Sequence, residues 1–257
     1  MSGNFSTLDI DYAEKYGIKE IQEKLKLILL KIDEVCRRYN IEYSIAYGTQ
    51  IGAVRHGGFI PWDDDADIIM TRTNYNKFKK AILNSEELEI IYYLWVERVI
   101  YKDFNDKNLF VDIMIFDNYP DSRIKASVKA LLSRICQGML HEKIIWDNYK
   151  GILKLALFVT RVLGKMIGSK KSLLLYNKIQ QIGNKKEAKQ LASYNSGYAD
   201  VKIPFEKELF FEYDDIKFEG ILLRTNKNWN EVLTKYYGNY MDLPPEEKRV
   251  PEHGRLI

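Results

Sequence analysis

The spacing of apolar residues predicts a helix near the start of the chain and a strand directly after it. Over residues 18–39, apolar side chains recur every three or four positions, which is the spacing of one helix face. Asn40 is a helix stop signal. Residues 41–47 then alternate between apolar and polar, which predicts a strand that ends at Gly48.

The remaining pattern predicts strands early in the chain and long helices in its middle. The further predicted strands cover residues 65–71, 88–93, 96–101, 109–116, 206–211 and 214–222. The further predicted helices cover 49–56 and 73–83, with Thr49 and Thr73 as N-caps, 122–182, with breaks at Gly151, Gly164 and Gly168, and 228–237, closed by Gly238. This order predicts an α+β (mixed α/β) fold, a mixed sheet flanked by helices, because a regular βαβ array would alternate.

An acidic cluster lies inside apolar sequence. Asp63, Asp65 and Asp67 occupy alternating positions, so on a strand they would project from one face. Like charges on one face repel, and a divalent cation relieves the repulsion. Acidic runs are often solvated loops or helix caps, but apolar residues flank this run on both sides. The pattern therefore favours a site for Mg²⁺, or for Mn²⁺ in its place, and with it phosphate chemistry.

A further carboxylate, Asp112, interrupts the apolar strand pattern of residues 110–115. A buried carboxylate is costly unless it is paired or metal-bound. We predict that Asp112 is a third metal ligand or a general base. A structural salt bridge is the alternative, although the sequence names no basic partner.

The Gly48-Thr49 turn is predicted to present the N-terminus of a short helix, where backbone N–H groups and the helix dipole bind phosphate. Arg55, His56 and Arg72 follow this helix or the acidic strand, so each is a candidate for neutralising phosphate charge. For Arg55, an ion pair with a clustered Asp is an equally good interpretation.

Aromatic residues beside these motifs could stack on a base or a sugar. Trp62 precedes the acidic cluster, and Tyr236, Tyr237 and Tyr240 lie around Gly238 near the end of the chain. Core packing is the commoner role for such side chains, and we expect it for Tyr236.

The charge of the chain is unevenly distributed. Residues 123–190 contain 15 Lys and Arg against 3 Asp and Glu, whereas the whole chain has 39 against 36. The middle segment thus carries +12 and the remainder −9. This asymmetry predicts an anionic partner for the middle segment. No nucleic-acid partner is predicted, because the segment contains no recognised binding motif and the acidic remainder would oppose it.

One predicted helix of the basic segment is amphipathic. Residues 152–167 have apolar residues at helical spacing and include Lys154, Arg161 and Lys165. The run is too short and too charged to span a bilayer. Peripheral contact with an anionic membrane and packing on the core are equally good interpretations.

Cysteine use and the N-terminus bear on location. Cys36 and Cys136 lie far apart, which does not make a disulfide framework, and no secretory signal is visible. We predict a cytoplasmic protein, with peripheral contact on the inner face of the cell membrane where the basic helix binds lipid.

Three sequence blocks resemble the LicD family of phosphotransferases. The blocks are Gly48-Thr49 with Gly52-Ala53-Val54-Arg55-His56 and residues 60–68, then residues 110–117, then Tyr237-Gly238-Asn239-Tyr240-Met241-Asp242-Leu243-Pro244-Pro245. Between about residues 122 and 189 we recognise no similarity. The resemblance implies a nucleotidyltransferase-like fold, a single catalytic domain over residues 1–257, and a helical insertion at about 122–190.

The resemblance also implies an activity. Such an enzyme would use Mg²⁺ on Asp65 and Asp67, with help from Asp112, to move a phospho-substituent from a CDP-linked donor to a glycan or a lipid-linked glycan. Phosphocholine, phosphoglycerol and phosphoribitol are all candidates for the group. It further implies that residues 237–241 approach the site. Two alternatives stay open: a nucleotidyltransferase that transfers NMP to a small molecule, and a non-catalytic protein that binds membranes or polyanions.

Overall fold

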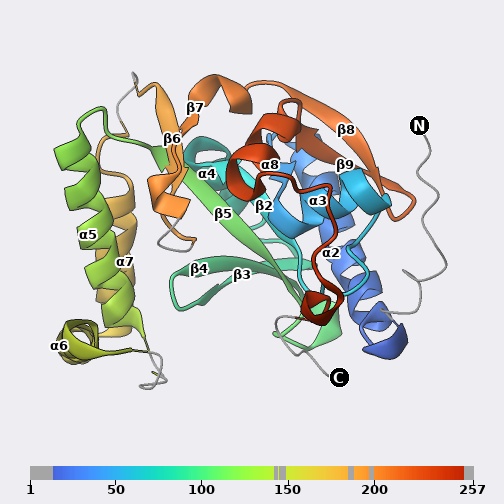
Figure 1. The fold of residues 1–257 in the computed structure, drawn as a ribbon. Helices are drawn as coiled ribbons and strands as arrows, with labels where there is room; N and C mark the ends of the chain where they lie inside the picture. Colours follow the sequence, from blue (N-terminus) through green and yellow to red (C-terminus); the bar gives the residue numbers. More distant parts are fainter. Residues whose placement is uncertain (1–13, 142–143, 145–148, 185–187, 197–199, 252–257) are drawn as a thin grey trace. The chain divides into compact units, whose positions relative to one another are not determined.

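The computed structural model describes residues 14–141, 144, 149–184, 188–196 and 200–251 (Figure 1). The chain forms two compact units. Unit 1 comprises Met1–Ile91, Arg98–Met114 and Glu208–Ile257, and unit 2 comprises Tyr92–Glu97 and Ile115–Lys207. Helices and a mixed sheet make up the described residues, which confirms the predicted α+β class. The basic segment lies within unit 2, and its place in a single domain stays a prediction.

One sheet runs in the order β1-β2-β5-β4-β3, and β5 also pairs with β6, which pairs with β7. Its strands are β1 (Ser44–Ile45), β2 (Asp67–Thr71), β3 (Leu88–Tyr93), β4 (Val96–Tyr101), β5 (Phe110–Asn118), β6 (Gln190–Ser193) and β7 (Phe205–Glu206). Strand β1 is antiparallel to β2, with Ser44 opposite Ile69. The strand predicted over residues 41–47 is therefore only two residues long. The strand predicted from Asp65 begins at Asp67 instead.

Helices α2 and α4 of unit 1 pack against each other, and α4 packs against β2. Helix α2 (Lys19–Arg38) confirms the predicted first helix, and its buried stripe includes Leu25, Ile28 and Ile32. Helix α4 (Arg72–Ala81) starts earlier than predicted, because Thr71 rather than Thr73 is its N-cap. The Thr71 hydroxyl accepts a hydrogen bond from the Asn74 amide at 3.4 Å.

Unit 1 also contains a two-stranded hairpin and a C-terminal helix. The hairpin joins β8 (Tyr213–Phe218) to β9 (Ile221–Asn226) through Glu219 and Gly220, both at positive φ. The sequence prediction missed this turn and placed one strand across residues 214–222. Helix α8 (Trp229–Tyr237) ends at Gly238 as predicted.

Four short 3-10 helices are described in the two units. They are η1 (Lys102–Phe104), η3 (Asp200–Lys202), η4 (Lys207–Phe210) and η5 (Glu246–Lys248).

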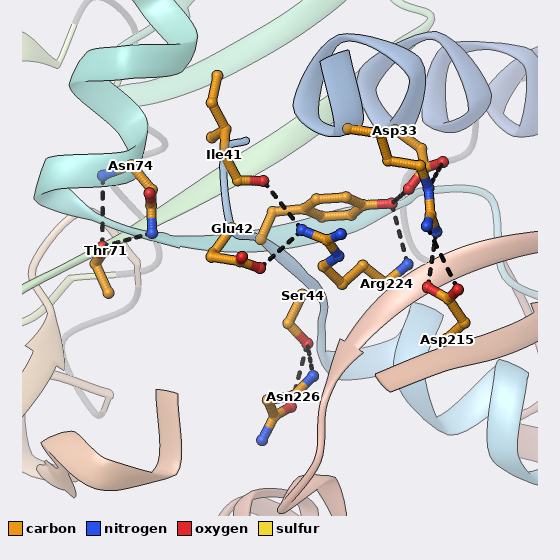
Figure 2. Close-up of polar contacts among 11 residues, drawn as sticks. Asp33, Ile41, Glu42, Ser44, Thr71, Asn74, Asp215, Arg224 and Asn226 are labelled. Atoms are coloured by element: carbon orange, nitrogen blue, oxygen red, sulfur yellow. Dashed lines mark hydrogen bonds and ion pairs between the residues drawn. The ribbon is translucent and has the colours of Figure 1, made fainter. Parts of the chain in front are cut away.

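A polar network fastens β9 to α2 and to the segment that contains β1 (Figure 2). The Tyr43 hydroxyl donates to buried Asp33 at 2.9 Å and accepts from the Arg224 amide at 3.2 Å. Arg224 also pairs with Glu42 at 2.7 Å. The Asn226 amide donates to the Ser44 hydroxyl at 3.0 Å. These bonds satisfy polar groups that burial would otherwise penalise.

Unit 2 is built around three helices, with α5 in contact with both α6 and α7 (Figure 1). They are α5 (Arg123–Leu140), α6 (Gly151–Ile167) and α7 (Ser169–Gln180). The break predicted at Gly164 is wrong, because Gly164 lies inside α6. A Cβ at this position would lie 2.0 Å from the Met139 carbonyl oxygen, so the glycine permits close packing of α6 on α5. The strand predicted over 206–211 is also wrong beyond Glu206, where η4 follows.

No helix in the described part of the chain is both long enough and apolar enough to cross a bilayer.

The α5–α6 contact yields a matched pair of substitutions. At Gly164 the obstacle to a Cβ is the Met139 backbone, whereas at Gly138 it is the Thr160 side chain, whose hydroxyl can rotate away although its Cβ would stay 2.9 Å from the new methyl group. We expect Gly164→Ala to lower the free energy of unfolding by about 1–3 kcal/mol, the usual cost of overpacking. Gly138→Ala should lose less, because a side chain yields more easily than a backbone, while the gain in helix propensity of roughly 1 kcal/mol is the same at both helical positions. Urea denaturation of both variants checks the order, and equal losses would contradict it.

Candidate active site

The acidic motif is fixed to the start of α3 through the backbone of Asp67. Helix α3 (Tyr47–His56) contains Thr49 in its first turn, where the side chain is 1% exposed. The Thr49 hydroxyl accepts a hydrogen bond from the Asp67 amide at 2.9 Å, and the Asp67 carbonyl accepts one from the Ala46 amide at 3.0 Å. Thr49 was predicted as an N-cap, but Ala46 holds that position. The hydroxyl instead fixes the first residue of β2.

The three carboxylates predicted to bind metal lie on neighbouring segments of unit 1. Asp65 and Asp67 flank Ala66, whose carbonyl accepts a hydrogen bond from the Asp112 amide at 2.9 Å. Asp65 lies before β2 and Asp67 begins it, and both side chains are half-buried. Within the described ranges, no group of three or more His, Cys, Asp or Glu side chains is arranged to hold a metal ion.

Asp112 has a basic partner that the sequence did not identify. Arg98 on β4 donates from Nε to Asp112 Oδ1 at 2.8 Å, and both side chains are largely buried. The Arg98 guanidinium also lies over the Phe110 ring, 3.5 Å from its centroid. Alternation along β4 could have pointed to Arg98, because it shares a face with Val96 and Ile100. The pairing of β4 with β5, which brings Arg98 to Asp112, could not be predicted from the sequence.

The N-terminus of α3 faces a protein carboxylate. A Cβ on Gly48 would lie 2.6 Å from Asp63 Oδ2, so only glycine allows Asp63 to come this close. The backbone of Asp63 is held by α2, because Gln22 Nε2 donates to the Asp63 carbonyl at 2.9 Å. A carboxylate at a helix N-terminus interacts favourably with the dipole, and a phosphate does so in the same way. No pattern in the sequence indicated that Gln22 contacts the acidic motif.

Arg55 ties the first sequence block to the third. Its buried guanidinium donates from Nη1 to the carbonyls of Tyr240 at 2.9 Å and Asp242 at 3.2 Å. Nε donates to His56 Nε2 at 2.9 Å. The phosphate contact and the ion pair that the sequence suggested for Arg55 stay predictions. Burial, together with the adjacent Arg55 charge, lowers the pKa of His56 to about 4, so the imidazole is neutral near pH 7.

The aromatic candidates separate into buried and exposed residues. Trp62 and Tyr240 belong to one buried cluster with Ile51, Ile60 and Leu233. Tyr237 is 48% exposed at the end of α8, directly before Gly238, whose φ is +65°. The half-buried Tyr236 packs edge-on against Tyr47, with ring centroids 5.1 Å apart.

The remaining basic candidates lie on two helices. Arg72 is the first residue of α4 and is 9% exposed, with its guanidinium 5.6 Å from the Tyr75 ring centroid. Lys154, Arg161 and Lys165 all lie on α6 in unit 2. Lys154 and Lys165 are exposed, and Arg161 is half-buried.

Comparison with known proteins identifies the family. Residues 40–129 match the nucleotidyltransferase domain of the LicD/FKTN/FKRP family, a range that includes Thr49, Asp65, Asp67 and Asp112. The lipopolysaccharide cholinephosphotransferase LicD of Haemophilus influenzae is 32% identical over 93% of this chain and 97% of its own length. The chain belongs to the LicD family. It is therefore an enzyme, a phosphotransferase of LicD type.

Two further relatives cover part of the chain. Uncharacterised proteins of Rickettsia typhi and Rickettsia prowazekii are 34% and 32% identical, each over 46% of this chain and over 40% and 48% of their own lengths. Membership of the LicD family confirms the resemblance predicted from the three sequence blocks.

The Thr49 hydrogen bond can be tested by an isosteric change. Thr49→Val keeps the side-chain volume but leaves the buried Asp67 amide without its acceptor, so we expect a loss of about 1–3 kcal/mol in the free energy of unfolding. Native-state hydrogen exchange should show the Asp67 amide losing protection. Thr49→Ser retains the hydroxyl and should keep that protection. Unchanged exchange at Asp67 in Thr49→Val would refute the assignment.

The Arg98–Asp112 pair calls for a double-mutant cycle. Removing Arg98 leaves a buried carboxylate without its guanidinium, so Arg98→Gln should cost on the order of 3 kcal/mol. The double variant Arg98→Gln/Asp112→Asn should lose less than the two single losses added together, with a coupling of at least about 1 kcal/mol. Chemical denaturation of the four proteins gives this coupling. Simple additivity would show that the pair contributes no stability of its own.

Proposed function

We propose that this enzyme transfers a phospho-substituent from a CDP-linked donor to a cell-surface glycan or its lipid-linked precursor. The observation that carries the proposal is 32% identity with a lipopolysaccharide cholinephosphotransferase across nearly the full length of both chains. Phosphocholine is therefore the first group to test, followed by phosphoglycerol and phosphoribitol.

Asp65 and Asp67 would hold the metal, Mg²⁺ or Mn²⁺. The residues fit a site completed by substrate, because Mg²⁺ is usually bound through one or two carboxylates together with substrate phosphates and waters. That donor set needs no third protein ligand. When bound, the ion would neutralise phosphate charge and orient the donor.

The protein groups have separate roles in this proposal. Thr49 holds the backbone of Asp67, and Arg98 holds Asp112. Asp112 would accept the proton of an acceptor hydroxyl, whose oxygen attacks the donor phosphorus distal to the cytidine. A new O–P bond forms, the pyrophosphate O–P bond breaks, and CMP leaves. The N-terminus of α3 would bind the donor phosphates through its backbone N–H groups, in competition with the Asp63 carboxylate beside Gly48.

A nucleotidyltransferase reaction is the second candidate, because the matching family domain is described as a nucleotidyltransferase domain. In that reaction the acceptor would attack the other phosphorus and gain CMP. The two reactions therefore differ in which half of the donor becomes attached to the acceptor.

We place the reaction in the cytoplasm, at the inner face of the cell membrane, where a lipid-linked acceptor would be met. The proposed reaction has two substrates, the glycan acceptor and the CDP-linked donor.

The test is a panel of CDP-choline, CDP-glycerol, CDP-ribitol and CDP-ethanolamine, with release of CMP and mass of the modified acceptor as readouts. One donor should release CMP in the presence of Mg²⁺, and EDTA should stop the release. Asp65→Asn and Asp67→Asn should each lower turnover at least about 100-fold, since metal assistance is worth several kcal/mol.

Asp103→Asn is the matched control, because Asp103 is an exposed residue of η1 and the chemical change is the same. Near-normal turnover in either motif variant would remove the metal site from the proposal. Transfer of CMP to the acceptor would establish the nucleotidyltransferase reaction instead.

A further inference from the structure

Helix α6 of unit 2 exposes an apolar stripe. Five apolar residues recur at spacings of three and four along the helix and are all exposed. They are Ile152 (81%), Leu155 (62%), Val159 (48%), Val162 (41%) and Met166 (79%). Such spacing places them on one face of the helix. The sequence left core packing and membrane contact as equal interpretations, and this exposure is the observation that separates them.

The direction of the stripe follows from how α6 packs on α5. The buried residues of α6 are Leu157 and Gly164, and Gly164 lies against the Met139 backbone of α5. At about 100° per residue, the centre of the stripe lies roughly opposite these two residues. The stripe therefore points away from α5. Membrane-binding amphipathic helices present an apolar face of this kind to the lipid.

Basic residues of α6 lie roughly 120° from the centre of the stripe, between the stripe and the face that packs on α5. Lys154, Arg161 and Lys165 fall within about 40° of one another on the helical wheel, to one side of the apolar face. The first two turns of α6 also border an open hollow lined by Gly151, Lys154, Leu155 and Phe158. Long basic side chains beside an apolar stripe can reach phosphate groups while the stripe enters the acyl region.

The charge of residues 123–190 favours a membrane over a second copy of the chain as the partner of the stripe. Residues 123–190, which include α5 to α7, carry 15 basic and 3 acidic residues. Two copies that met through this segment would bring like charges together, which opposes association. An anionic phospholipid surface is complementary both to this charge and to the apolar stripe.

From these observations we infer that α6 is a peripheral binding surface for anionic phospholipid bilayers. The helix lies flat in the interface, with Leu155, Val159 and Met166 toward the acyl chains and Lys154 and Lys165 at the phosphates. This inference deepens the proposed function by giving unit 2 a way to bring the enzyme to a lipid-linked acceptor. Lipid binding itself needs neither donor nor acceptor.

The experiment is co-sedimentation of the full chain with phosphatidylglycerol–phosphatidylcholine vesicles, without any nucleotide. The wild-type protein should bind these vesicles, should bind pure phosphatidylcholine weakly, and should dissociate as salt rises. Leu155→Glu/Met166→Glu and Lys154→Glu/Lys165→Glu should each lower the partition coefficient at least about tenfold. All four side chains are exposed, so the fold should survive, which thermal melts followed by circular dichroism will check.

Matched controls lie in unit 1. Leu83→Glu/Leu222→Glu exchanges two exposed leucines, and Lys77→Glu/Lys80→Glu exchanges two exposed lysines, with the same change in charge. Both controls should bind vesicles better than the corresponding α6 variants. Equal binding by the α6 variants and their controls, or no binding of wild type to anionic vesicles, would overturn the inference.

Light scattering tests whether the stripe instead joins two copies of the chain in a dimer. A wild-type dimer that Leu155→Glu/Met166→Glu converts to monomer would make the stripe a contact between chains and overturn the inference. Because these assays contain no CDP compound, failure here leaves the proposed transfer reaction untouched. Failure of the donor panel likewise leaves lipid binding untouched.

Discussion

The hydrogen bond from the Asp67 amide to the Thr49 hydroxyl fixes the acidic motif in space. Strand β1 has only two residues, so its ladder with β2 provides little register on its own. The buried hydroxyl adds a contact between the first turn of α3 and the first residue of β2. Asp112 is linked to the same motif, because its amide donates a hydrogen bond to the carbonyl of Ala66, the residue before Asp67. The Thr49 hydrogen bond and the pairing of β2 with β5 thus act together to place the three candidate carboxylates.

Basic residues near the motif mainly hold the protein itself in shape. Arg55 binds two backbone carbonyls, and Arg98 pairs with Asp112. Under the proposed function, the metal and the N-terminus of α3 would help to neutralise phosphate charge, and the phosphate contacts predicted for Arg55, His56 and Arg72 stay predictions. A rigid scaffold suits a phosphotransferase, because it holds the carboxylates in position for the metal and the donor phosphates.

Sequence reasoning succeeded where local signals agree and failed where tertiary contacts decide. Periodicity located α2, and Gly238 located the end of α8, because both signals are local. The start of α4 was misplaced, since two threonines can cap it and only Thr71 meets the Asn74 amide. Gly164 was taken as a helix break because its actual role, close contact with α5, has no local signature.

The candidate site shows the same limit. The acidic residues and Gly48 were identified from spacing and from a family resemblance. Their partners Arg98 and Gln22 were not, because a partner across a sheet or on another helix depends on pairing that one sequence does not reveal. Asp63 and Asp65 lie before β2 rather than on it, so alternation along an extended strand overstated the regularity of the cluster.

The two carbonyls that Arg55 binds are synthesised long after Arg55 itself. Tyr240 follows Arg55 by 185 positions. At translation rates of about 5–20 residues per second, roughly 10–40 s separate the two on the ribosome. Through most of that interval the nascent chain already contains Asp63, Asp65 and Asp67, whereas the Arg55 guanidinium has not yet met its acceptors. These contacts of Arg55 can therefore form only after Tyr240 and Asp242 have been synthesised, 185 and 187 positions after Arg55 itself.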